Sequence, residues 1–209
     1  MTMDPLDQAL RTCPVIAILR GLLPQNAVAV GEALVKAGIR VIEVPLNSPD
    51  PFESVRRLAQ WAGPEMMVGV GTVLTLEQVK QAKQAGAQIV LSPNADHAVI
   101  RQTKLLSMFS VPGVATPSEG FAALQAGADA LKLFPAETIG PVGLKAWRSV
   151  FDKGVRIIPV GGVSAQNASD YLNAGAAGLG AGSSIFAPGD TPDMVFDKAQ
   201  RIVNACIGR

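Results

Sequence analysis

Residues 84–91 read Gln-Ala-Gly-Ala-Gln-Ile-Val-Leu, and this stretch holds the pattern from which the fold is predicted. Its first three residues end a helical pattern, and glycine suits the left-handed conformation that commonly closes a helix. The apolar run Gln88–Leu91 follows immediately. A solid run of Val, Ile and Leu is typical of a parallel strand buried on both faces. The stretch therefore predicts a helix that ends at a glycine and leads directly into a buried strand.

The same pattern recurs along the chain. An Ala-Gly pair ends a helical pattern at four glycines, which lie 48, 41 and 48 residues apart: Gly38, Gly86, Gly127 and Gly175. Eight apolar runs have the character of buried strands: Val15–Leu19, Val41–Leu46, Met66–Val70, Gln88–Leu91, Val111–Val114, Ala130–Phe134, Val155–Val160 and Ala177–Ala181. Each interval spans two strand–helix units, so the four glycines mark four pairs of units, or eight units in all.

Eight parallel strands, each followed by a helix, predict an α/β fold of the (β/α)8 TIM-barrel type. We expect a single barrel domain over residues 1–209, with a short N-terminal helix. An open doubly wound sheet is the alternative, but it usually carries a glycine fingerprint after its first strand. Here that strand is followed by Arg20-Gly21-Leu22-Leu23-Pro24, which is no such fingerprint.

The sequence also predicts where several helices begin. Thr116-Pro117-Ser118-Glu119 predicts a capping Thr, a Pro at the first helical position and a capping-box Glu. Thr75 with Gln78 and Thr191 before Pro192 repeat the device more loosely. Ser164 is expected to cap the helix that follows the seventh strand.

Composition and charge exclude several classes of protein. Apolar residues make up 48% of the chain and charged residues 17%, which supports a large core and argues against disorder. The net charge is +1 without a basic block, so no nucleic-acid partner is expected. No apolar run is long enough to span a membrane, and no signal pattern opens the chain. The two cysteines, Cys13 and Cys206, fit a reduced, cytoplasmic setting.

Two charged residues lie inside apolar strands. Glu43 interrupts the second run and Lys132 the sixth. Both runs are even-numbered, and alternate strands of a barrel fill the same interior layer, so the two side chains are expected to approach each other across the barrel. One interpretation is a buried ion pair that only fills the interior.

The second interpretation is a catalytic pair. A lysine in an apolar pocket is partly the free amine and is therefore nucleophilic, and a nearby carboxylate can move protons. The remaining lysines fall in helical or flanking segments, where solvated faces are their expected place: Lys36, Lys80, Lys83, Lys104, Lys145, Lys153 and Lys198.

Glycine clusters follow the seventh and eighth strands. The first contains Gly161-Gly162, and the second reads Gly180-Ala181-Gly182-Ser183-Ser184. Glycines let backbone N–H groups approach an anion closely, and the loops after these two strands are the usual phosphate site of such barrels. The sequence therefore predicts that a phosphate group binds there.

The ends of the first three strands supply further candidates. Arg20 follows the first strand, where a guanidinium can bind a carboxylate, and Thr72 follows the third with a hydroxyl. Asn47-Ser48-Pro49 is interpreted as a turn or helix cap. His97, the single histidine, is expected at the surface or at a helix cap. With no second histidine and no carboxylate cluster, no metal or other cofactor is expected.

Taken in order, these motifs resemble the 2-keto-3-deoxy-6-phosphogluconate and 6-phosphogalactonate aldolases. The similarity runs from Pro14 to Phe186, with seven motifs: Pro14–Gly21, Glu43–Pro49, Gly69–Leu74, Ser92-Pro93-Asn94, Pro112–Thr116, Lys132–Glu137 and Gly161-Gly162-Val163.

The resemblance implies a class I aldolase, usually a homotrimer, that releases pyruvate and D-glyceraldehyde 3-phosphate. It implies a Schiff base on Lys132 and an acid/base role for Glu43. It further implies Arg20 and Thr72 as ligands of the pyruvate end of the substrate. Residues around the phosphorylated end would be Gly161, Val163, Gly182 and Ser183.

The two branches of the family differ after the strand-two glutamate. The phosphogluconate type typically carries Thr-Leu-Arg, whereas this chain has Pro45-Leu46-Asn47, which resembles the phosphogalactonate type. The run Phe134-Pro135-Ala136-Glu137 looks more like the phosphogluconate type.

Two functions outside this family stay open. One is a phosphate-binding barrel isomerase or synthase, in which Lys132 and Glu43 only move protons and no Schiff base forms. The second is a catalytically silent phosphosugar-binding or assembly protein. Release of pyruvate from a phosphorylated keto-deoxy acid would exclude the silent protein, and a pyruvyl adduct on Lys132 would exclude the isomerase or synthase.

Overall fold

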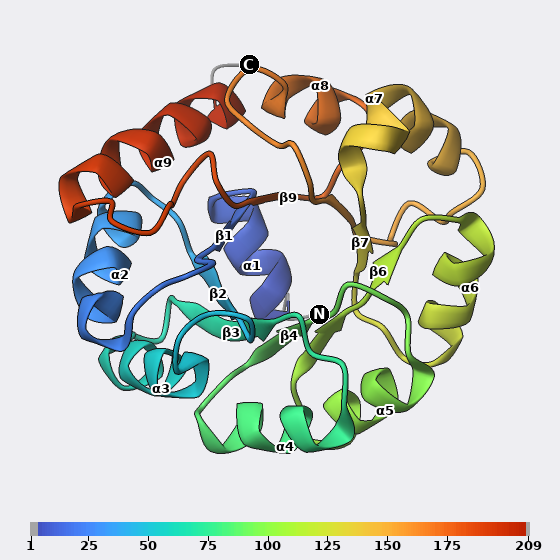
Figure 1. Cartoon of the computed structure of the whole chain (residues 1–209). Helices are drawn as coiled ribbons and strands as arrows, with labels where there is room; N and C mark the ends of the chain where they lie inside the picture. The colour runs from blue at the N-terminus through green and yellow to red at the C-terminus, as the bar shows by residue number, and fades with distance from the viewer. Residues whose placement is uncertain (1–3, 208–209) are drawn as a thin grey trace.

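The computed structural model describes residues 4–207, with parallel strands surrounded by helices (Figure 1). The strands are β1 (Val15–Ile18), β2 (Val41–Pro45), β3 (Met67–Gly71), β4 (Ile89–Leu91), β5 (Phe109–Val111), β6 (Gly113–Val114), β7 (Leu131–Leu133), β8 (Ile157–Pro159) and β9 (Leu179–Ala181). The helices are α1 (Pro5–Thr12), η1 (Pro24–Asn26), α2 (Ala27–Lys36), α3 (Pro51–Trp61), α4 (Leu76–Gln84), α5 (His97–Leu105), α6 (Pro117–Gln125), α7 (Ala136–Trp147), α8 (Ala168–Asn173) and α9 (Pro192–Ile207).

All strand pairs are parallel, and they form two sheets. The six-stranded sheet has the order β5-β4-β3-β2-β1-β9, and the three-stranded sheet has the order β6-β7-β8. All eight predicted runs contain strands. The parallel α/β prediction is therefore confirmed, whereas the single closed eight-stranded sheet that we expected is not observed.

The hydrogen-bonded ladder is divided at two places. The fifth predicted run is split into β5 and β6 by Pro112, which has no N–H to donate to a ladder. At the second seam, β8 ends at Pro159 and meets β9 through an isolated bridge between Val160 and Gly180. In addition, the Ala177 N–H donates to the Ile157 carbonyl at 2.9 Å.

Helix ends follow the sequence signals closely. The four glycines of the repeat all have positive φ, with 99° at Gly38 and 104° at Gly127. Full capping boxes form at Thr75 and Thr116, and Thr191 accepts a hydrogen bond from the Met194 N–H.

The cap predicted at Ser164 was wrong. The helix α8 begins at Ala168, with Asn167 in the N-cap position. The Asn167 side chain accepts a hydrogen bond from the Ser164 N–H at 2.9 Å. A turn over residues 165–167 precedes the helix, and the Ser164 carbonyl accepts hydrogen bonds from the Asn167 and Ala168 N–H groups. The serine thus takes part through its backbone and not as a side-chain cap.

The expected N-terminal helix is present as α1. Its side chains Leu6, Ala9 and Leu10 are buried in one cluster with strand residues such as Ile16 and Met67. The helix lies across the centre of the strand arrangement (Figure 1) and closes the end at which the strands begin, here called the N-terminal face. The opposite end, the C-terminal face, is left to the loops that follow the strands. Among the described residues, no helix combines the length and apolarity needed to cross a membrane.

Candidate active site

The two charged residues predicted inside strands are both buried. Glu43 in β2 is 2% exposed and Lys132 in β7 is 7% exposed. Each has apolar, fully buried neighbours in its own strand, Ile42 and Val44 for the glutamate and Leu131 and Leu133 for the lysine. Within the described chain, no hydrogen bond and no ion pair within 4.0 Å joins the two side chains, although each charge influences the pKa of the other group.

Burial changes the acidity of both groups. Loss of solvation raises the pKa of Glu43 from 4.5 to about 7, although the positive charges of Lys132 and Arg20 oppose the shift. Loss of solvation lowers the pKa of Lys132; the Glu43 carboxylate opposes this and the Arg20 charge adds to it. Near neutral pH the site thus holds a carboxyl group with both protonation states populated, and an amine that deprotonates more readily than an ordinary lysine.

The Glu43 carboxylate occupies space that only a glycine leaves open. A Cβ at Gly71, the last residue of β3, would lie 2.0 Å from Glu43 Oε2. This oxygen is buried without a hydrogen-bond partner among the described residues. Unpaired buried polar atoms are uncommon and often mark sites of chemistry. Gly71 was missed by the sequence interpretation, although a glycine within a strand is a signal of close approach.

An aromatic ring lies beside the lysine. Lys132 Nζ is 4.7 Å from the centroid of the Phe134 ring. Phe134 follows β7 directly and also lines a cavity of about 430 Å³ on the C-terminal face. The amine therefore sits next to the wall of this cavity.

The cavity gathers residues that follow five different strands. Those predicted from the sequence are Arg20, Gly161, Val163, Gly182 and Ser183, and the structure brings all of them together in its lining. Further lining residues that were not predicted include Ile18, Asn47, Phe134 and Phe186. Lys132, Glu43 and Thr72 are not part of the lining. Two lining residues connect the buried pair to the cavity. The Phe134 ring contacts the Lys132 amine, and Ile18 in β1 lies beside Glu43 in β2.

One hydrogen bond joins the two glycine loops: the Ser184 hydroxyl donates to the Val163 carbonyl at 2.7 Å. A second orders the first loop internally, where the Asn167 amide donates to the Gly162 carbonyl at 2.9 Å. Of the two adjacent serines, Ser184 is thus used to join the loops, while Ser183 is exposed at the cavity. The arrangement presents glycine backbone to the cavity, as an anion site requires.

The segment after β2 is more than the turn that the sequence suggested. It does form a turn, with the Ser48 N–H donating to the Pro45 carbonyl at 2.9 Å, but the cap of α3 is Asp50. Ser48 is buried, and its hydroxyl accepts a hydrogen bond from the Gly21 N–H at 3.0 Å. Because Gly21 follows Arg20, this bond holds the backbone that carries the arginine.

Thr72 and His97 take less central positions. Thr72 is half-buried directly after β3 and has a φ of 60°, an unusual conformation for a β-branched residue. His97 is exposed at the start of α5, where Asp96 makes the cap, as the surface interpretation predicted. The described residues contain no group of three or more His, Cys, Asp or Glu side chains that could hold a metal ion.

Known proteins match almost the whole chain. The family model described as KDPG and KHG aldolase matches residues 6–200. A probable 2-dehydro-3-deoxy-6-phosphogalactonate aldolase of Rhizobium meliloti is 46% identical over 89% of this chain and 88% of its own length. The 2-dehydro-3-deoxy-6-phosphogalactonate aldolase of Escherichia coli is 38% identical over 92% and 94%. A solved structure described as native KDPGal superposes with a TM-score of 0.90, at 38% identity, over 92% of this chain and 93% of its own.

Proposed function

The chain belongs to the KDPG and KHG aldolase family, whose members are class I aldolases, and on that basis we propose that it cleaves 2-dehydro-3-deoxy-6-phosphogalactonate into pyruvate and D-glyceraldehyde 3-phosphate. The enzyme is thus an aldehyde-lyase. The observation that carries the assignment of its site is the buried pair Lys132 and Glu43 beside a glycine-lined cavity.

Lys132 forms the covalent intermediate in this proposal. Its free amine attacks the C2 carbonyl of the substrate, and loss of water gives an iminium. Burial supports this role because it favours the neutral amine. The iminium then accepts the electron pair of the C3–C4 bond.

Glu43 moves the protons. As the carboxylate it removes the proton of the C4 hydroxyl, the C3–C4 bond breaks, and the aldehyde phosphate leaves. The enamine that remains on Lys132 takes a proton at C3 with the help of the protonated Glu43, and hydrolysis of the iminium frees pyruvate. A pKa near 7 suits a group that must take up and return a proton at neutral pH.

The cavity binds the two ends of the substrate. Arg20 and Thr72 hold the carboxylate end, and the phosphate lies among Gly161, Val163, Gly182 and Ser183. All of these residues except Thr72 line one cavity, which supports their binding the same substrate. The division between its two ends, and the role of Thr72, are taken from the family resemblance. Binding of the remote phosphate holds the reacting carbons in place at the amine.

The choice between C4 epimers is decided at Asn47 and Arg20. Both line the cavity. Asn47, after β2, contributes an amide where the phosphogluconate type carries an arginine, and Arg20, after β1, supplies the guanidinium. This arrangement shifts the carboxylate anchor relative to Glu43. We expect a higher kcat/KM for the phosphogalactonate than for the phosphogluconate, measured side by side under one set of conditions. A tenfold preference for the phosphogluconate, about 1.4 kcal/mol, would reject the branch but leave the aldolase assignment standing.

Ser48 positions Arg20 for substrate. Replacing it by alanine removes the acceptor of the Gly21 N–H, and a single hydrogen bond contributes about 1 kcal/mol. In Ser48→Ala we expect KM to rise roughly fivefold while kcat stays nearly unchanged, since the bond lies away from the amine. Steady-state kinetics measure KM and kcat of this variant and of a control, Ser118→Ala, which changes an exposed serine of α6. Equal KM values in the two variants would refute the positioning role.

Assembly and location follow from the same assignment. We propose that both sheets belong to one (β/α)8 barrel, that residues 1–209 form one domain, and that three copies assemble into a homotrimer, as the family resemblance implies. The Val160–Gly180 bridge and the short Pro112 connection support closure of the barrel. A cytoplasmic location suits an enzyme whose substrate and product carry phosphate.

A further inference from the structure

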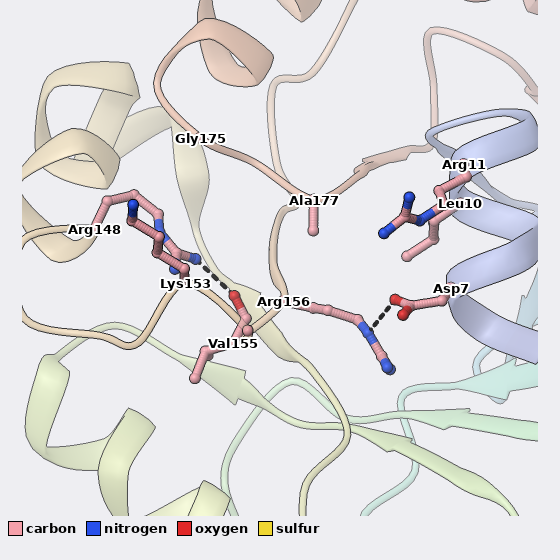
Figure 2. Close-up of a pocket in the computed structure, with 10 residues that line it drawn as sticks. Asp7, Leu10, Arg11, Arg148, Lys153, Val155, Arg156, Gly175 and Ala177 are labelled. Atoms are coloured by element: carbon pink, nitrogen blue, oxygen red, sulfur yellow. Dashed lines mark hydrogen bonds and ion pairs between the residues drawn. The ribbon is translucent and has the colours of Figure 1, made fainter. Parts of the chain in front are cut away.

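A second cavity lies far from the proposed active site. It has a volume of about 420 Å³ and sits at the N-terminal face, between α1, the end of α7 and the segments that lead into β8 and β9 (Figure 2). Its lining is Asp7, Leu10, Arg11, Arg148, Lys153, Gly154, Val155, Arg156, Gly175 and Ala177. Four of these side chains are cationic and one is a carboxylate.

One of the cations is neutralised within the protein. Arg156 Nε lies 2.7 Å from Asp7 Oδ1, and the guanidinium also contacts the Asp4 carboxylate. The single carboxylate of the lining is therefore already engaged, and the charge of Arg156 is compensated. The excess of positive charge comes from the remaining three side chains.

Arg148 is held rigidly without a carboxylate partner. Its guanidinium donates to the Val155 carbonyl at 2.6 Å and to the Asp152 carbonyl at 2.7 Å. Carbonyl oxygens fix its orientation but leave its charge uncompensated. A guanidinium that is already fixed loses little further freedom when an anion arrives.

Arg11 and Lys153 supply the rest of the excess positive charge in this cavity. Both are exposed, and neither makes a hydrogen bond or ion pair within residues 4–207 as described. Figure 2 shows the Arg11 guanidinium extending from α1 toward Ala177, on the opposite side of the cavity from Arg148 and Lys153. Three uncompensated cations thus border one hollow from two sides.

We propose that this cavity binds the phosphate group of a small metabolite, at a site separate from the active site. Guanidinium groups match the oxygen geometry of phosphate, and a lysine adds a point charge. The volume exceeds that of a bare phosphate and leaves room for an attached carbon skeleton. The bound phosphate would connect α1 to the segment before β8. This inference does not depend on the proposed reaction.

Calorimetric titration with inorganic pyrophosphate tests the site. The active-site cavity is first closed to phosphate by Ser183→Asp, which adds a negative charge there. In that background we expect one remaining binding event. Adding Arg11→Gln and Lys153→Gln, both exposed positions, should weaken it by tenfold or more. Adding Lys83→Gln and Arg101→Gln, which remove the same charge at exposed positions outside both cavities, should change it less than twofold.

Two outcomes would overturn the proposal. If the Arg11→Gln/Lys153→Gln and Lys83→Gln/Arg101→Gln pairs weakened pyrophosphate binding equally, the binding would be a general attraction to positive charge and not a property of this cavity. No binding in the Ser183→Asp background would mean that the active-site cavity is the phosphate site and the second cavity is not. Aldolase activity of the Arg11→Gln/Lys153→Gln variant with native Ser183 is measured in parallel, so failure here is distinguished from failure of the proposed function.

Discussion

Replacing Lys132 by methionine is expected to abolish aldol cleavage while the protein still folds. Methionine has similar length, and removing a charge whose burial is unfavourable offsets the loss of the contact between the amine and the Phe134 ring. No neutral thioether can form an iminium, and without one the C3–C4 bond has no acceptor for its electrons. Pyruvate release should fall to the background rate.

The control for this variant is Lys83→Met, which removes an exposed lysine of α4. It should retain the activity of the parent enzyme. Circular dichroism and the melting temperature establish that both variants fold. Substantial turnover in a folded Lys132→Met protein would refute the covalent mechanism and favour an isomerase or synthase that only moves protons.

Replacing Glu43 by glutamine is expected to separate the two chemical roles. Cleavage should slow by roughly 10²–10⁴-fold, the usual contribution of a general acid/base. Formation of the imine with pyruvate should persist, since the amine is untouched. If pyruvate were no longer trapped on Lys132 while cleavage persisted, the roles assigned to Lys132 and Glu43 would be wrong.

The same variant carries a pH signature. The Glu43 carboxylate favours the charged form of Lys132, so its removal leaves burial and the Arg20 charge to lower the pKa of Lys132 further. The amine then becomes neutral at lower pH. The pH at which borohydride trapping reaches half its maximum should therefore move downward in Glu43→Gln. An upward shift would contradict the electrostatic account of the pair.

Local signals predicted much of the fold. Each of the eight apolar runs contains a strand, and the capping boxes at Thr75 and Thr116 form as written. These features depend on residues close in sequence, whose preferences act within one turn or strand. The division at Pro112 was legible in principle, since proline cannot donate to a ladder, but it was passed over within an otherwise apolar run.

Contacts between segments that are distant in the chain could not be predicted from the sequence. Ser48 looked like an ordinary turn residue because its partner, the Gly21 N–H, lies on another loop. Gly71 gained its meaning only from the position of the Glu43 carboxylate. Glu43 and Lys132 themselves were predictable, because a charge inside a solid apolar run is costly to bury and calls for an explanation.

The most direct test of the covalent mechanism is reduction of the enzyme with borohydride in the presence of pyruvate, followed by peptide mass mapping. The account predicts one stable pyruvyl adduct per chain, located on Lys132 and absent from Lys132→Met. An active enzyme that gains no adduct, or that carries it on another lysine, would contradict the assignment of Lys132.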